Sequence, residues 1–145
     1  MKENLLISRC FLGVNCKYNG KNNLIDKIEL LKNKYNLYDV CPESDGGLST
    51  PRVPSEIQRN GLIVTKTGLD VTSEYNKGAD LALNTALKYK CSVALFKEKS
   101  PSCGVDKIYN GAFNGTLISG QGNTTALLRK AGIKVYSEND IDELL

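Results

Sequence analysis

Residues 92–104 read SVALFKEKSPSCG, and this stretch decides the fold class. Its first part, Ser92–Phe96, is apolar-rich and of strand length, and the charged residues KEK end the run. A short apolar run of this kind is typical of a strand that is buried on both faces of a parallel sheet. We therefore expect Cys103 to lie in a turn-rich loop that leaves the end of a buried strand.

Other segments repeat this pattern and alternate with helical ones. Further strands are predicted at Asn4–Ser8, Tyr35–Val40 and Ile133–Tyr136. Apolar spacing predicts helices over Leu24–Leu31, Tyr75–Tyr89 and Thr125–Lys130, and a short acidic helix near Glu138–Leu145. Residues 42–61 contain several glycines and prolines and are predicted to form a long loop. The alternation predicts an α/β fold with a mainly parallel sheet and helices on both faces, in Rossmann-like three layers.

Length and charge limit the function classes. A chain of 145 residues fits one domain, so we expect a single domain over residues 1–145 with one site. A net charge of +3, with the signs interspersed, gives no strong nucleic-acid or membrane signal and suits a small ligand better. No apolar run approaches the roughly 18 residues of a membrane span, and residues 1–6 lack the order of a signal peptide. We expect a cytoplasmic protein of unknown oligomeric state.

The chain has five cysteines and no histidine. In a reducing cytoplasm, clustered cysteines are more often ligands or catalysts than disulfides. The lack of histidine excludes Ser-His-Asp and Cys-His nucleophile activation and every histidine-based metal site. Any metal must therefore be held by thiolates and oxygens, and proton transfer must use Asp, Glu, Lys, Tyr or Cys.

Cys10, Cys41 and Cys103 each follow a predicted strand. Loops at the carboxyl ends of parallel strands converge on one crevice, so these thiols are expected to meet there. Three thiolates suit zinc or an iron–sulfur cluster, and three ligands leave one metal position open, as catalytic sites do. Cys16 is a candidate fourth ligand, whereas Cys91 is expected to be a buried hydrophobe.

Two polar residues flank these cysteines. Glu43 lies two residues after Cys41 and is the best general acid/base candidate. Ser100 lies three residues before Cys103 and is placed to orient water or substrate. The competing interpretation is that both residues only stabilise their own loops, through hydrogen bonds between the carboxylate or hydroxyl and nearby backbone amides.

Several motifs in order resemble the thiouracil desulfurase family, long catalogued as a bacterial domain of unknown function. They are SRCFLGVNCKYNG at 8–20, VCPESDGGLSTPRVPSE at 40–56, TGLDVTSEYNKGA at 67–79, KEKSPSCG at 97–104 and GNTTALLRKAGIKVYSEND at 122–140. The resemblance covers nearly the whole chain.

The resemblance implies a [4Fe-4S] cluster bound by Cys10, Cys41 and Cys103, whose remaining iron binds the sulfur of the substrate. It also implies non-redox desulfuration of a thiolated nucleobase or nucleoside of the 2- or 4-thiouracil type, assisted by Glu43 and Ser100. In the loop after the first cysteine the family often has arginine and aspartate, whereas this chain has Lys17, Tyr18 and Asn19, so its substrate preference is expected to differ. Some relatives carry a second domain associated with tRNA, which this chain lacks, so a free base or nucleoside is the expected substrate.

Two other functions compete with the desulfurase. The first is a structural or regulatory module in which Cys10, Cys16, Cys41 and Cys103 close a four-sulfur metal site without catalysis. The second is a thiol redox enzyme, which is disfavoured because the chain has no C-x-x-C motif.

Overall fold

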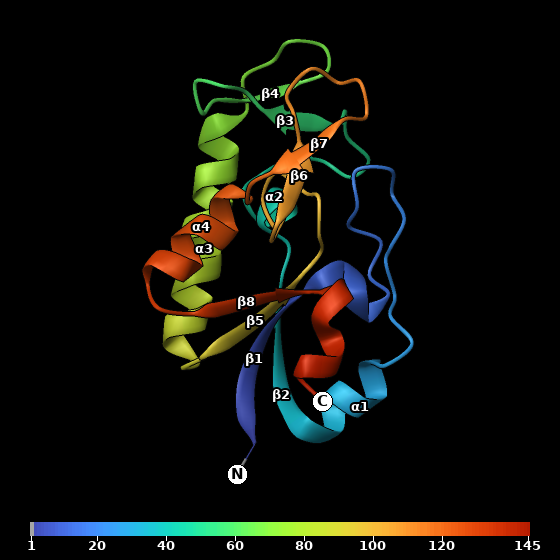
Figure 1. The fold of residues 1–145 in the computed structure, drawn as a ribbon, viewed down its shortest axis with the longest axis vertical. Helices are drawn as coiled ribbons and strands as arrows, with labels where there is room; N and C mark the ends of the chain where they lie inside the picture. The colour runs from blue at the N-terminus through green and yellow to red at the C-terminus, as the bar shows by residue number, and fades with distance from the viewer. Residues whose placement is uncertain (1) are drawn as a thin grey trace.

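The computed structural model describes residues 2–145 and confirms the predicted α/β fold. The central sheet has the strand order β2-β1-β5-β8, and each of these pairings is parallel (Figure 1). Its strands are β1 (Glu3–Ser8), β2 (Tyr35–Val40), β5 (Val93–Phe96) and β8 (Lys134–Ser137). The strand predictions are confirmed because central strands covered on both faces leave continuous apolar runs in the sequence.

Helices cover both faces of the sheet, as predicted. They are α1 (Ile28–Lys34), α2 (Pro42–Asp45), α3 (Thr72–Lys88) and α4 (Asn123–Lys130), with 3-10 helices η1 (Arg9–Leu12) and η2 (Glu138–Glu143). On one face, Ala82 of α3 and Leu128 of α4 join the buried core with β5. On the other face, Leu31 of α1 packs with Leu144 against β1 and β5. Among residues 2–145, no helix has both the length and the apolar character needed to cross a membrane.

Two helix predictions are wrong in detail. The first helix begins at Ile28 and not at Leu24, because the Asn22 side chain accepts the Leu24 amide in a turn and leaves Leu24 60% exposed. The C-terminal acidic helix is the 3-10 helix η2. Its kink at Asp140 interrupts the helical backbone.

Two small hairpins lie beyond the carboxyl edge of the central sheet, where Figure 1 shows them above β1, β5 and β8. Strand β3 (Ser55–Ile57) pairs antiparallel with β4 (Ile63–Thr65), and β6 (Lys107–Tyr109) pairs antiparallel with β7 (Leu117–Ser119). The predicted long loop at residues 42–61 therefore contains α2 and β3. Strands of three residues are too short to show a period in the sequence.

Helix α2 is fixed by direct backbone contact with α3. A Cβ atom added to Gly78 would lie 1.8 Å from the carbonyl oxygen of Pro42, and one added to Gly46 would lie 2.0 Å from that of Glu74. Only glycine permits this approach. The contact fixes the helix that begins directly after Cys41, and with it the position of that thiol.

Candidate functional site

A cavity of about 580 Å³ opens at the carboxyl ends of β1, β2 and β5. Four of the five cysteines line it, together with both predicted polar residues: Cys10, Cys16, Cys41, Cys103, Glu43 and Ser100. The structure thus brings together every residue that the sequence singled out for the site. Cys91 is buried outside this cavity, as expected.

Cys10 and Cys41 lie where β1 and β2 end. Cys10 is in η1, its carbonyl oxygen accepts the Asn23 amide at 2.9 Å, and the Asn23 side-chain amide donates to its sulfur at 3.4 Å. Cys41 caps α2, and its amide donates to the Asp45 carboxylate at 3.1 Å. Each sulfur is therefore carried on backbone that local hydrogen bonds hold in place.

An ion pair joins the segments that carry these two cysteines. Arg9, the neighbour of Cys10, donates to both carboxylate oxygens of Asp45, at 2.9 and 3.1 Å. The same carboxylate accepts the amide of Cys41. Asp45 therefore links the end of β1 to the start of α2, and its role is to hold the two loops together.

The loop that carries Cys103 is folded around Glu98. This carboxylate is 5% exposed and accepts the backbone amides of Lys99, Val105, Asp106 and Lys107, at distances from 2.6 to 3.2 Å. Burial raises the pKa of Glu98, but the amide donors outweigh burial, so its net pKa lies below the usual value. A buried carboxylate thus closes the loop from both sides of Cys103.

Helix α4 holds the same loop from the other direction. Its first amides, from Asn123 and Thr124, donate to the carbonyl oxygens of Pro101 and Ser102 at 2.9 and 3.0 Å. The Thr125 hydroxyl donates to the carbonyl oxygen of Cys103 at 3.0 Å. The carbonyl oxygens of the Cys103 loop therefore accept amides at the start of α4 that would otherwise lack partners. The same hydrogen bonds hold the loop in position.

Cys16 lies beside Cys10 and Cys41. Its side chain interacts with the thiols of Cys10 and Cys41. Both contacts raise the pKa of Cys16, and the contact with Cys10 has the larger effect. The same interaction is the main reason that the pKa of Cys10 is lowered and that the pKa of Cys41 falls to about 6. Burial raises the pKa of Cys103. Because Cys16 has a single thiol hydrogen, it favours ionisation of one of its two neighbours, Cys10 or Cys41, at a time.

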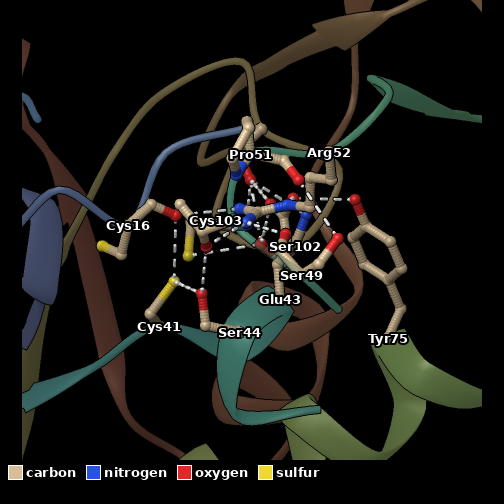
Figure 2. Close-up of polar contacts among 12 residues, drawn as sticks. Cys16, Cys41, Glu43, Ser44, Ser49, Pro51, Arg52, Tyr75, Ser102 and Cys103 are labelled. Carbon is tan, nitrogen blue, oxygen red and sulfur yellow. Dashed lines mark hydrogen bonds and ion pairs between the residues drawn. The ribbon is translucent and has the colours of Figure 1, made fainter. Parts of the chain in front are cut away.

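Glu43 collects hydrogen-bond donors from three segments (Figure 2). One carboxylate oxygen accepts Tyr75 Oη at 2.9 Å and Arg52 Nε at 3.2 Å. The other accepts Ser102 Oγ at 2.9 Å and Ser100 Oγ at 3.1 Å. The Arg52 and Glu43 side chains are 9% and 15% exposed, so this ion pair is largely removed from water. The network fixes the carboxylate toward the cavity that the thiols line.

Ser102 and Tyr75 are members of this network for which the sequence predicts no role at the site. The motif SPSCG places two hydroxyls on alternate residues before Cys103, and in extended backbone this spacing points both side chains the same way, which is a signal for Ser102. Tyr75 lies in the predicted helix, and its hydroxyl reaches Glu43 only because α3 crosses α2 closely. No sequence signal marks that long-range contact.

The chemistry of the donor set fits an iron–sulfur cluster. Cys10, Cys41 and Cys103 line one cavity and offer the soft thiolate ligands that such clusters take. Among residues 2–145, no group of three or more Cys, Asp and Glu side chains is arranged to hold a single metal ion. The Asn23 side-chain amide donates to the sulfur of Cys10, and hydrogen bonds to ligand sulfurs tune cluster potentials.

Comparisons with known proteins identify the family to which this chain belongs. Residues 5–140 match the family model described as 2-thiouracil desulfurase. The chain is 43% identical to the uncharacterized protein YbbK of Bacillus subtilis (strain 168), over 97% of this chain and 99% of that protein. It is also similar to the solved structure named [4Fe-4S]-dependent thiouracil desulfidase TudS, with a TM-score of 0.93, 46% identity, and coverage of 99% of this chain and 95% of that one. The chain therefore belongs to the 2-thiouracil desulfurase family.

Proposed function

We propose that this chain removes sulfur from a thiolated nucleobase or nucleoside of the thiouracil type, using a [4Fe-4S] cluster held by Cys10, Cys41 and Cys103. The observation that carries the proposal is the shared cavity, in which strand-end thiols face a carboxylate that accepts four side-chain donors. The family match and the name of the similar solved structure support the same assignment.

The overall reaction balances without an oxidant or reductant. A thiocarbonyl and one water give a carbonyl and one hydrogen sulfide, so the carbon–sulfur bond breaks and a carbon–oxygen bond forms at the same carbon. When bound, the cluster supplies a soft Lewis acid for the thiocarbonyl sulfur. The protein must then deliver water to the carbon and manage its protons.

Glu43 is the residue proposed to manage those protons. Its carboxylate lines the cavity and is held from one side by Arg52 and Tyr75. We assign it the role of general base toward the attacking water. Ser100 and Ser102, which donate to its other oxygen, are then placed to orient that water or the substrate.

The ligand assignment is tested by single cysteine-to-serine substitutions. Cys10→Ser, Cys41→Ser and Cys103→Ser are expected to lower bound iron and sulfide and to abolish sulfide release from 2-thiouracil. Cys16→Ser is expected to keep the iron, because three ligands leave one position open for the substrate. Cys91→Ser is the matched control, since Cys91 is buried but does not line the cavity.

The same series separates the competing functions. If Cys16→Ser loses the metal as the other three variants do, the site is closed by four sulfurs and the structural module is favoured. If the metal that remains bound is zinc, the desulfurase assignment is wrong. Iron and acid-labile sulfide are quantified per chain after anaerobic reconstitution.

A further inference from the structure

One wall of the cavity is formed by the loop between β6 and β7. Phe113 lies in this loop and lines the cavity together with the cysteines. Among residues 2–145, three residues other than glycine have a positive φ: Lys90, Lys99 and Phe113. The last two line the cavity. A bulky residue adopts this backbone only where its surroundings impose it, and such strain gathers at functional sites.

A buried carboxylate imposes this conformation on Phe113. Glu56 of β3 is 9% exposed, and its Oε1 accepts the amides of Gly111 at 2.9 Å and Phe113 at 3.2 Å. The Gln58 side chain donates to the carbonyl oxygen of Gly111 at 3.1 Å. A Cβ atom on Gly111 would lie 2.8 Å from the Ile57 carbonyl oxygen, so the loop lies directly on β3.

Glu56 repeats the arrangement seen at Glu98. Each is a buried carboxylate that accepts the amide of a positive-φ residue on the cavity wall, Lys99 in one case and Phe113 in the other. Glu98 thereby fixes the loop of Cys103. Glu56 fixes the backbone that carries the Phe113 side chain at the cavity wall, and strained backbone of this kind gathers at functional sites.

We propose that Phe113, held by Glu56, is the specificity-determining residue that stacks on the planar pyrimidine ring of the substrate. This inference rests on the proposed function, which requires a planar heterocycle in the same cavity. An aromatic face stabilises a stacked base and has no polar group of its own. Base-edge recognition and proton transfer are thus left to the polar groups around Glu43. Glu56, which accepts the amides of Gly111 and Phe113, is a positioning residue.

Two other aromatic residues line the cavity and are poorer candidates. Tyr18 is 46% exposed and lies in the loop after Cys16. Tyr109 ends strand β6. Of the three, only Phe113 has both a positive φ and a buried carboxylate bonded to its own amide.

The first test uses the absence of tryptophan from the sequence. Phe113→Trp places a single tryptophan on the proposed stacking wall, and Leu87→Trp places one on the exposed surface of α3 as a matched control. The reconstituted variants are titrated with uracil, with excitation at wavelengths that uracil does not absorb. Emission from Phe113→Trp is expected to fall saturably, whereas emission from Leu87→Trp stays constant.

The second test separates binding from chemistry. Phe113→Leu keeps an apolar side chain but removes the ring, and it is expected to raise KM for 2-thiouracil by about 2- to 13-fold with kcat nearly unchanged. Phe113→Tyr restores the ring and is expected to restore KM. Glu56→Ala is expected to raise KM in the same way, and Glu56→Gln, which keeps an acceptor oxygen, to restore most of it.

The outcomes distinguish this inference from the proposed function. If the wild-type protein releases sulfide but Phe113→Leu leaves KM unchanged, or uracil does not quench Phe113→Trp, the stacking role is overturned and the desulfurase stands. If the wild-type protein releases no sulfide, the proposed function fails. The uracil titration still decides whether the Phe113 wall binds a pyrimidine.

Discussion

Glu98→Gln probes the loop that presents Cys103. The carboxylate accepts four backbone amides, and glutamine keeps one oxygen for them but loses the charge. Hydrogen bonds to a charged acceptor contribute about 1.5–3 kcal/mol each, against about 0.5–1.5 kcal/mol for neutral ones. Lys99, Asp106 and Lys107 are exposed, so water replaces part of what their amides lose. The amide of the buried Val105, which lies 2.6 Å from Glu98 Oε1, then sets most of the expected loss, about 1.5 kcal/mol in the free energy of unfolding.

The pH dependence of this loss follows from the lowered pKa of Glu98. Because the folded pKa lies below the unfolded value of about 4.3, the ionised carboxylate stabilises the fold fully above that pH. The stabilisation is lost as the pH falls through the folded pKa. Protonated Glu98 resembles glutamine, so the difference between wild type and Glu98→Gln is expected to be largest near pH 7 and to shrink below about pH 4.

Urea unfolding of the cluster-free protein at several pH values measures this difference. Equal stability of the two proteins at pH 7 would refute the argument that Glu98 anchors the loop. So would a difference that does not change on acidification, because its origin would then be packing and not charge.

Two further changes test how the neighbouring segments are held. Gly78→Ala is expected to destabilise the protein by about 3 kcal/mol in urea unfolding, because the added Cβ would lie 1.8 Å from the Pro42 carbonyl oxygen. The control Asn84→Ala, on the exposed face of α3, is expected to change the free energy of unfolding by less than about 0.5 kcal/mol. Similar stability of the two variants would rule out the close helix contact. A double-mutant cycle of Asp45→Asn with Arg9→Gln should give a coupling of about 1 kcal/mol that weakens with salt, since both side chains are partly exposed. Zero coupling would mean that this ion pair does not join the two cysteine segments.

The central sheet was predictable because its strands are covered on both faces. Apolar runs such as Ser92–Phe96 survive in the sequence for that reason, and the rule that strand ends converge then places Cys10, Cys41 and Cys103 near one another. These inferences use local pattern and one topological rule.

The rest of the site depends on contacts between distant segments. The Glu56 carboxylate meets the amide of Phe113, 57 residues away, and Tyr75 meets Glu43 across 32 residues. No local period or motif encodes these pairs. The short hairpins that carry Glu56 and Phe113 were missed for a related reason, since three-residue strands have no detectable alternation.

The most direct test of the proposed function is the fate of oxygen and sulfur during turnover. The reconstituted protein is incubated anaerobically with 2-thiouracil in water labelled with oxygen-18, without an added reductant. Hydrolytic desulfuration is expected to give equal amounts of sulfide and uracil, with the label at the carbon that carried sulfur. Failure to release sulfide, a requirement for a reductant, or unlabelled uracil would contradict hydrolytic desulfuration by this chain.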